Sequence, residues 1–209
     1  QMQQQLQEKE LLIKRSRESV QEERLFGERR AREAIAATRR LLMTGGQGEA
    51  TYETVMETAH TIVGAERSAL FIVDRKRRVL KTQTAHGADE IVIPIDKGIV
   101  GQCVSEARQV NIPDVSQSPL FNSDVDKKTG YTTRNILCSP IIDSTTGEVL
   151  GAVEVLNKID GDKFTVADQE ILELFADQIA QVMNGSRNIH TLQNALDEQQ
   201  AQARELQES

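Results

Sequence analysis

The sequence predicts an α+β domain, an antiparallel sheet covered by helices, with a long helix on either side of it in the chain. The first observation is the order of the expected elements in the middle of the chain, which is α-β-β-β-α-loop-β-β-α. Because most strands follow one another without a crossover helix, they are expected to pair antiparallel. The second observation is that apolar residues at both ends of the chain recur at heptad spacing, which is typical of coiled-coil helices.

Residues 1–43 are expected to form one long helix. The segment holds no Pro and one Gly, and it is rich in Gln, Glu, Arg, Leu and Ala. The residues at seven-residue spacing are Leu6, Ile13, Val20, Gly27, Ala34 and Leu41. The positions three or four residues further on are mostly charged, so only one of the two coiled-coil seams is sound. The glycines of TGGQGEA (44–50) are expected to end the helix and to form a short linker.

The middle of the chain, residues 50–183, is expected to hold the globular domain. The expected helices are 52–63, 98–108 and 164–183, and the expected strands are 68–74, 78–85, 90–95, 135–143 and 147–158. The last two strands are expected to form a hairpin around the turn STTG (144–147). Thr165 is the expected N-cap of the last helix, because a Thr side chain can accept a hydrogen bond from a free N–H group of the first helical turn.

The last helix is predicted to continue into a coiled coil over residues 184–209. Apolar residues lie at a and d positions, and Gln199 occupies the one polar slot, where it could set the register. The apolar positions are Phe175, Val182, Ile189, Leu192, Leu196, Ala203 and Leu206. Two helices of this kind flanking one domain predict a parallel coiled-coil homodimer.

Composition and charge exclude several classes of function. The chain carries 25 Lys and Arg against 32 Asp and Glu, and the excess of acid lies in the globular part, which argues against binding nucleic acid through a basic patch. Aromatic residues make up 3% of the chain, which leaves few partners for stacking bases. No apolar run approaches the roughly 20 residues of a membrane span. The chain opens on Gln without a signal peptide, so a fragment of a longer cytoplasmic protein is expected.

The two cysteines are expected to be buried, reduced thiols. Cys103 and Cys138 lie in apolar stretches, without CxxC spacing or a nearby His pair. A disulfide, a metal site and a cofactor are therefore not expected.

The segment FNSDVDKKTGYTTRN (121–135) shows neither helical nor strand periodicity. Segments of this length within a compact domain are usually functional or disordered. Its threonines Thr129 and Thr133 are four residues apart, so on a helical turn both hydroxyls would project in the same direction.

Five stretches together carry a family resemblance. They are ALFIVD (69–74), IPIDKGIVGQCV (93–104), VNIPDVSQSPLFNSDVDKKTGYTTRNILCSPI (110–141), GEVLGAVEVLNK (147–158) and FTVADQEILELFADQIA (164–180). In this order they resemble the GAF domain, and within that family the cyclic-nucleotide-binding regulatory domains of phosphodiesterases and adenylyl cyclases. Asn157-Lys158, Phe164 and Asp168 are similar to the family's NK…F…DE signature, with Gln169 in place of the final Glu.

The resemblance implies a ligand pocket closed by a lid over residues 119–135. On this reading Asn122, Asp126, Thr129 and Thr133 face the ribose, the phosphate or the base edge of a cyclic nucleotide. The resemblance also implies that Lys158 and Asp168 form an ion pair that keeps the pocket closed.

Further pocket residues follow from the same resemblance. Glu154 is implied as a pocket acid and Ser68 as a residue bordering the base, although an outward-facing strand Glu and an ordinary strand Ser are the alternatives. Ile99 and Val100 lie in GIVG at an expected helix start, where free N–H groups favour an anion such as a cyclic phosphate, although a simple tight turn would look the same. Many family members read the base with Phe-Asp where this chain has Ala85-His86, so His86 is the residue expected there and the choice between cAMP and cGMP stays open.

The expected function is that of a regulatory module that passes ligand binding to an effector domain of the same chain, such as a phosphodiesterase or a cyclase. The alternative is a ligand-free module that serves as a dimerisation spacer, and the missing Phe-Asp and the Gln169 substitution favour that alternative. No nucleophile with an adjacent base and no His-rich metal cluster is apparent, so this segment is not expected to be an enzyme.

Overall fold

A six-stranded antiparallel sheet forms the centre of the molecule, and this confirms the predicted α+β class. The computed structural model describes residues 2–44, 49–82 and 91–185. The strands are β1 (Ala65–Asp74), β2 (Val79–Thr82), β3 (Val92–Pro94), β4 (Val110–Ile112), β5 (Ile136–Ile142) and β6 (Val149–Lys158), in the order β3-β2-β1-β6-β5-β4. Every neighbouring pair is antiparallel, so the long strands β1 and β6 lie at the centre and the short strands lie at the edges.

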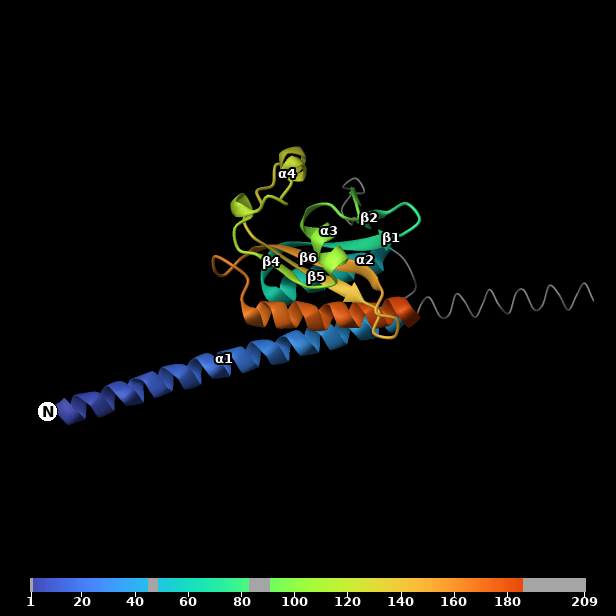
Figure 1. Cartoon of the computed structure of the whole chain (residues 1–209). Helices are drawn as coiled ribbons and strands as arrows, with labels where there is room; N and C mark the ends of the chain where they lie inside the picture. Colours follow the sequence, from blue (N-terminus) through green and yellow to red (C-terminus); the bar gives the residue numbers. More distant parts are fainter. Residues whose placement is uncertain (1, 45–48, 83–90, 186–209) are drawn as a thin grey trace, which may run out of the picture.

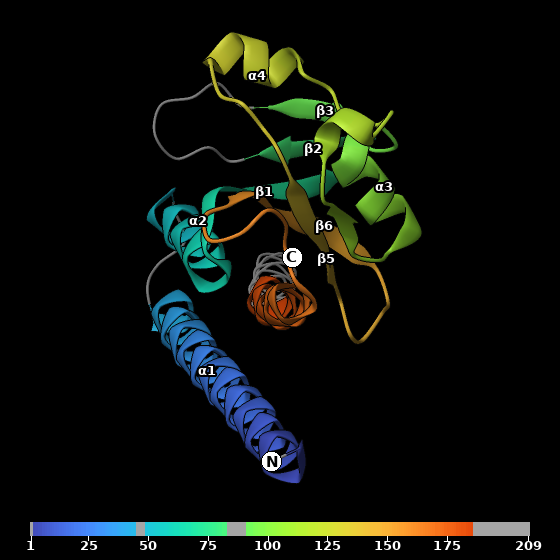
Figure 2. The ribbon, with the colours of Figure 1, turned by 90° about the vertical axis from the view of Figure 1, so that its left-hand side faces the viewer.

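Helices cover both faces of this sheet. One face carries α2 (Glu49–Val63), the helix over residues 166–185 and the last turns of α1 (Met2–Thr44). The other face carries α3 (Gly98–Glu106), with the 3-10 turn η1 (Val115–Gln117) and the short helix α4 (Asp124–Thr129) in the connection that follows it. Figure 1 shows α3 and α4 above the sheet, and the helix over 166–185 together with α1 below it. Figure 2 shows α3 on one side of the sheet and α2 on the other.

Two apolar clusters, one on each face, hold these layers together. The larger cluster joins β1, β5 and β6 to the helical layer, and Leu70, Phe175 and Leu172 are among its fully buried members. The smaller cluster joins the other face to α3, through residues such as Phe71, Val100 and Cys138. Leu70 and Phe71 lie on different faces because successive side chains of a strand point to opposite sides.

The described elements agree with most of those expected from the sequence. The expected hairpin around STTG is present as β5 and β6, whose register pairs Cys138 with Glu154. Three short elements were missed, namely the edge strand β4, the 3-10 turn η1 and the helix α4. None has a periodic pattern, because β4 is set by its pairing with β5, and η1 and α4 by local side-chain contacts.

The helix that follows β6 begins as its sequence predicts. Thr165 Oγ1 accepts a hydrogen bond from the backbone N–H of Asp168 at 3.2 Å, and Asp168 Oδ2 accepts one from the N–H of Thr165 at 2.8 Å. This reciprocal pair is a capping box formed with Asp, and it satisfies two N–H groups at the start of the helix.

The long N-terminal helix is present as α1. The predicted coiled-coil pairing of this helix stays a prediction, and residues 186–209 of the C-terminal coiled-coil segment lie outside the described residues. No helix in the described part of the chain has the length and apolar character that crossing a membrane requires.

Gly151 in β6 has no room for a side chain against the backbone of β1. A Cβ atom at this position would collide with the backbone carbonyl of Phe71 in β1, and a backbone atom cannot move aside cheaply. We predict that Gly151→Ala lowers the free energy of unfolding by about 2–4 kcal/mol, as overpacked core sites do. Chemical denaturation measures this change. Gly27→Ala is the matched control, because nothing lies within 4 Å of a Cβ there, and it is expected to be neutral or slightly stabilising.

Candidate ligand site beneath α4

Glu154 is a buried acid at the centre of the sheet. Its neighbours in register are Ala69 on β1 and Cys138 on β5, and the three side chains share the face that α3 covers. The residue is 9% exposed. Desolvation raises the pKa of its carboxyl to about 7, and no hydrogen bond or charge from another described residue offsets that effect.

A buried carboxyl without a partner is costly, so it needs an explanation. The expected alternative, an outward-facing strand Glu, does not fit a side chain that is nine-tenths buried. Glu154 is thus a buried acid to which no described residue donates a hydrogen bond.

Asp126 and Thr133 form a clasp that closes the segment around α4. Asp126 Oδ1 accepts a hydrogen bond from the Thr133 hydroxyl at 2.8 Å, and Asp126 Oδ2 accepts one from the Thr133 backbone N–H at 2.7 Å. Thr133 is buried and Asp126 is half-buried. The clasp ties α4 to the chain that enters β5, so the two predicted lid residues are brought together.

The other residues predicted to contact the nucleotide from the lid or the base side lie outside this clasp. Asn122 is exposed, and its Oδ1 accepts a hydrogen bond from the N–H of Asp124 at 2.9 Å, so it initiates α4. Thr129 is the last residue of α4, and its side chain is outside the described part of the structure. His86 lies between residues 83 and 90, which are outside the described residues altogether.

Ile99 and Val100 begin α3, as the sequence predicts. Both side chains are buried in the smaller core cluster, so only their backbone could face a ligand. The residue before the helix, Lys97, makes no side-chain cap, and Gly98 adopts a left-handed conformation with a φ of 70°. The N–H groups of this first turn therefore lack a side-chain cap, and they carry the positive end of the helix dipole.

Ser68 is separated from these residues by the sheet. Its hydroxyl donates to the carbonyl oxygen of Met56 in α2 at 2.5 Å, which places it on the face covered by the helical layer. Ser68 thus joins β1 to α2, and in this structure it does not lie with Glu154 and α3.

Lys158 and Asp168 form the ion pair that the resemblance implies, with Nζ and Oδ1 2.9 Å apart and both side chains largely buried. Lys158 Nζ also donates to the carbonyl oxygen of Val63 at the end of α2. The pair thus fastens β6 to the two main helices of the helical layer. Its direct contacts are on the side of the sheet opposite to α4.

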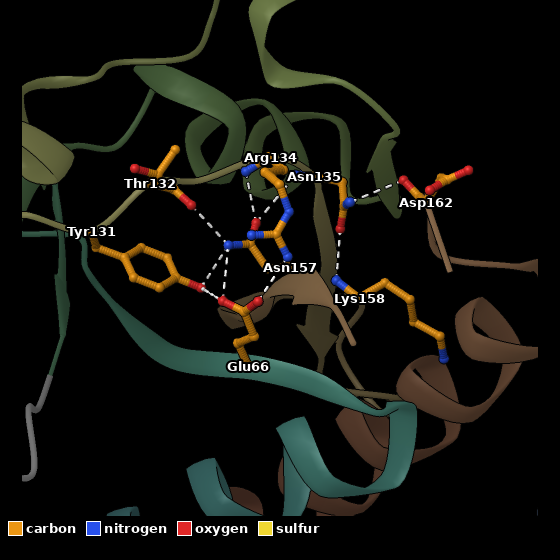
Figure 3. A network of polar contacts seen from close by, with 8 residues as sticks. All are labelled: Glu66, Tyr131, Thr132, Arg134, Asn135, Asn157, Lys158 and Asp162. Atoms are coloured by element: carbon orange, nitrogen blue, oxygen red, sulfur yellow. Dashed lines mark hydrogen bonds and ion pairs between the residues drawn. The ribbon is translucent and has the colours of Figure 1, made fainter. Parts of the chain in front are cut away.

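Asn157 organises the chain where it leaves the lid and enters β5, a role that the sequence analysis missed (Figure 3). Its Oδ1 accepts the N–H of Arg134 at 2.7 Å, and its Nδ2 lies 2.8 Å from both the carbonyl oxygen of Thr132 and the hydroxyl of Tyr131. The residue is fully buried and has a φ of 58°, a left-handed conformation that Asn tolerates better than most residues. The sequence feature that pointed to Asn157 was the Asn-Lys pair of the family signature.

Glu66 completes this network at its exposed end. The carboxylate accepts hydrogen bonds from Arg134 at 2.7 Å, from Tyr131 at 2.8 Å and from Asn157 at 3.1 Å. These bonds, the one from Arg134 first, lower the pKa of Glu66 to about 2. Burial and the neighbouring carboxylate raise the pKa of Tyr131, and Arg67 stacks on its ring at 4.0 Å.

A cavity of about 480 Å³ lies next to the clasp. Its lining residues are Pro113, Asp114, Val115, Ser116, Thr133, Arg134, Asn135, Gly161 and Asp162. Glu154 and α3 do not line it, so it is a separate depression at the β4 side of the sheet, related to the clasp only through Thr133.

Comparison with known proteins identifies the family. A family model described as GAF domain matches residues 47–183. The chain belongs to the GAF domain family. At the level of the fold, the chain is similar to the GAF domain of a phosphoenolpyruvate-protein phosphotransferase from Coxiella burnetii, with a TM-score of 0.66 and 16% identity, covering 77% of this chain and 96% of that one. It is also similar to free methionine-R-sulfoxide reductase from Neisseria meningitidis, with a TM-score of 0.62 and 17% identity, covering 76% and 91%.

Two similar curated proteins have phosphodiesterase names. The GAF segment is 39% identical over 136 residues to a probable 3',5'-cyclic phosphodiesterase pde-5 of Caenorhabditis elegans, covering 58% of this chain and 18% of that protein. It is 34% identical over 128 residues to a dual 3',5'-cyclic-AMP and -GMP phosphodiesterase 11A of Takifugu rubripes, covering 54% and 14%. The chain thus spans less than a fifth of either relative. Kinship with these GAF segments supports a regulatory module.

The Asn157 network yields a testable prediction. Asn157→Gly keeps the left-handed backbone and removes every side-chain hydrogen bond, so the free energy of unfolding should fall by about 2–4 kcal/mol. The amide of Arg134, which loses its acceptor, should exchange with solvent much faster. Arg78→Gly is the control, because Arg78 is exposed and also left-handed, with a φ of 56°. Equal hydrogen exchange at the backbone amide of Arg134 in both variants would show that Asn157 does not hold the segment that leads from the lid into β5.

Glu154 yields a prediction on pH. Its pKa is raised from 4.5 to about 7, so between these values the folded protein keeps a proton that the unfolded chain releases. The free energy of unfolding therefore falls as the pH rises through this window. Glu154→Gln abolishes the ionisation and should be more stable than the wild type above pH 7 by on the order of 2–3 kcal/mol, with little difference at pH 4.5. Urea unfolding across this range measures both proteins, and a constant difference at all pH values would contradict the prediction.

Proposed function

We propose that this GAF domain is the regulatory module of a larger signalling protein and binds a cyclic nucleotide, cAMP or cGMP, beneath α4. The observation that carries the proposal is Glu154, a buried acid without a partner among the described residues on the face that α3 covers. Two relatives whose names state cyclic nucleotide phosphodiesterase activity support the choice of ligand class.

The cyclic phosphate would lie at the start of α3. The side chain of Lys97 does not cap the first turn of α3, so the N–H groups of Ile99 and Val100 can donate hydrogen bonds to an anion. Gly98 keeps the approach to this turn free of side-chain atoms. The purine would then extend toward Glu154, which can accept a hydrogen bond when ionised and donate one when protonated.

The segment around α4 is the lid. Its clasp, the pair Asp126 and Thr133, holds α4 to the chain that enters β5. A ligand that contacts Thr133 from inside the pocket strengthens the closed state and shifts the population toward it.

The lid is connected to the helical layer by a short chain of hydrogen bonds. Asn135, two residues after Thr133, accepts the N–H of Lys158 on its side-chain oxygen at 2.8 Å, and Lys158 holds Asp168 at the start of the last helix. We infer that closure of the lid reaches the flanking helices by this route. The effector domain of the same chain, a phosphodiesterase or a cyclase, would be the receiver.

The second candidate is a ligand-free dimerisation spacer. The specific observation in its favour is that Asn122 and Asp126, both expected to face the nucleotide, already accept hydrogen bonds inside the lid. A direct measurement of nucleotide binding distinguishes the regulatory module from the spacer.

Calorimetric titration with cAMP and with cGMP tests the proposal. We expect saturable binding of at least one nucleotide, weakened by about 1–3 kcal/mol in Thr133→Val, because the carboxylate of Asp126 loses its hydroxyl partner within a closed site. Thr132→Val is the matched control, since this neighbouring residue is exposed. Absence of heat and of any rise in melting temperature with either nucleotide at millimolar concentration would leave the spacer as the function.

A further inference from the structure

A run of four basic residues forms the turn between β1 and β2. All of them are exposed, and they are Arg75, Lys76, Arg77 and Arg78. The turn is held in shape by Asp74, whose Oδ1 accepts a hydrogen bond from the backbone N–H of Arg77 at 3.0 Å. We call residues 75–78 the basic turn.

One cation of the basic turn has an acidic partner. Arg75 Nε donates to Glu148 Oε1 at 2.5 Å, and Nη2 of the same side chain donates to the carbonyl oxygen of Val149 at 3.1 Å. Within the described part of the chain, the side chains of the other three residues of the turn take part in no ion pair. The nearby Asp74 is itself paired with Lys81, with Nζ and Oδ2 3.2 Å apart.

The basic turn reverses the sign of the charge that the domain carries elsewhere. The chain holds 32 Asp and Glu against 25 Lys and Arg, and the excess of acid lies in the globular part. Adjacent like charges repel each other, so three unpaired cations side by side are unfavourable on a free surface. An anionic partner removes this repulsion, and acids more than about 8 Å away are largely screened at physiological salt.

The basic turn lies at the end of the domain where the last helix also ends (Figure 1). Arg75 holds Glu148, just before the start of β6. On the other side of the turn that joins β5 to β6, the pKa of Asp143 is lowered by the backbone N–H of Thr145 first, and also by the side chain of Asn184 in the last helix. A partner docked at this end therefore lies beside the end of the last helix and away from α4.

We propose that the basic turn docks an acidic protein segment, a stretch of Asp and Glu on another domain of the same polypeptide. Arg and Lys side chains bind carboxylates through charge-assisted hydrogen bonds, and an Arg can hold both oxygens of one carboxylate. That a larger protein supplies the segment rests on the proposed function, whereas the binding itself needs no nucleotide.

The chemistry of the turn favours this partner over a membrane surface. The turn contains no apolar side chain that could enter a bilayer. Attraction to anionic lipids contributes about 1 kcal/mol per cation near the surface, which leaves three cations with weak binding. A segment of the same polypeptide is present at an effective concentration of the order of millimolar, so a contact of similar strength is enough to hold it.

Residue-resolved NMR of the full chain tests the docking site. The probe is a peptide of about eight Glu residues, and we expect saturable shifts of the backbone amide signals centred on the basic turn. Raising the salt should weaken the binding, because it screens exposed charges. The combined variant Lys76→Gln, Arg77→Gln and Arg78→Asn should weaken it by about tenfold or more, since it removes three charge pairs. Asn is chosen at position 78 because the backbone there is left-handed, with a φ of 56°.

A second combined variant is the matched control. Lys9→Gln, Arg15→Gln and Arg17→Gln remove the same charge from exposed positions of α1, so this variant should bind the peptide as the wild type does. Equal weakening by the two variants, shifts centred on other residues, or no binding would overturn the proposal. Sedimentation of the wild type with vesicles of phosphatidylserine and phosphatidylcholine, lost in the turn variant, would make a membrane the partner and overturn it too. Failure of nucleotide binding would leave the proposal unaffected.

Discussion

The side chain of Asn157 is the constraint on which the arrangement of this GAF domain depends. The lid segment between η1 and β5 has no regular backbone pairing of its own at its exit, so its N–H and C=O groups need partners. Asn157 supplies an acceptor to Arg134 and a donor to Thr132 and Tyr131 from a buried position at the end of β6. Lys158, the next residue along the chain, pairs with Asp168 at the start of the last helix. Asn157 and Lys158 together thus hold the lid exit and the start of the last helix.

The polar groups of the lid and those of the sheet differ in whether they have hydrogen-bond partners within the protein. Asp126, Thr133 and Asn157 have partners within the protein, so they stabilise the scaffold. Glu154 has no such partner among the described residues, and desolvation alone raises its pKa. A fold tolerates an unpaired buried acid at a cost in stability, and such costs are concentrated at functional positions. This contrast, more than the list of implied contacts, is the reason why we propose Glu154 as the centre of the site.

The sequence predicted those parts of the fold that are set by local chemistry. The central strands have apolar patterns of sufficient length, and the capping box at Thr165 is complete within four residues. The edge strand β4 could not be predicted from three residues, because its pairing with β5 creates it. For the site, the resemblance placed Glu154 and Thr133 near α3 and α4. It also implied Ser68, but the side chain of Ser68 points to α2. The alternation of side chains along a strand defines two faces, and it does not show which face borders the pocket. Asn157 was visible as a motif, whereas its hydrogen bonds arise only from the folded chain.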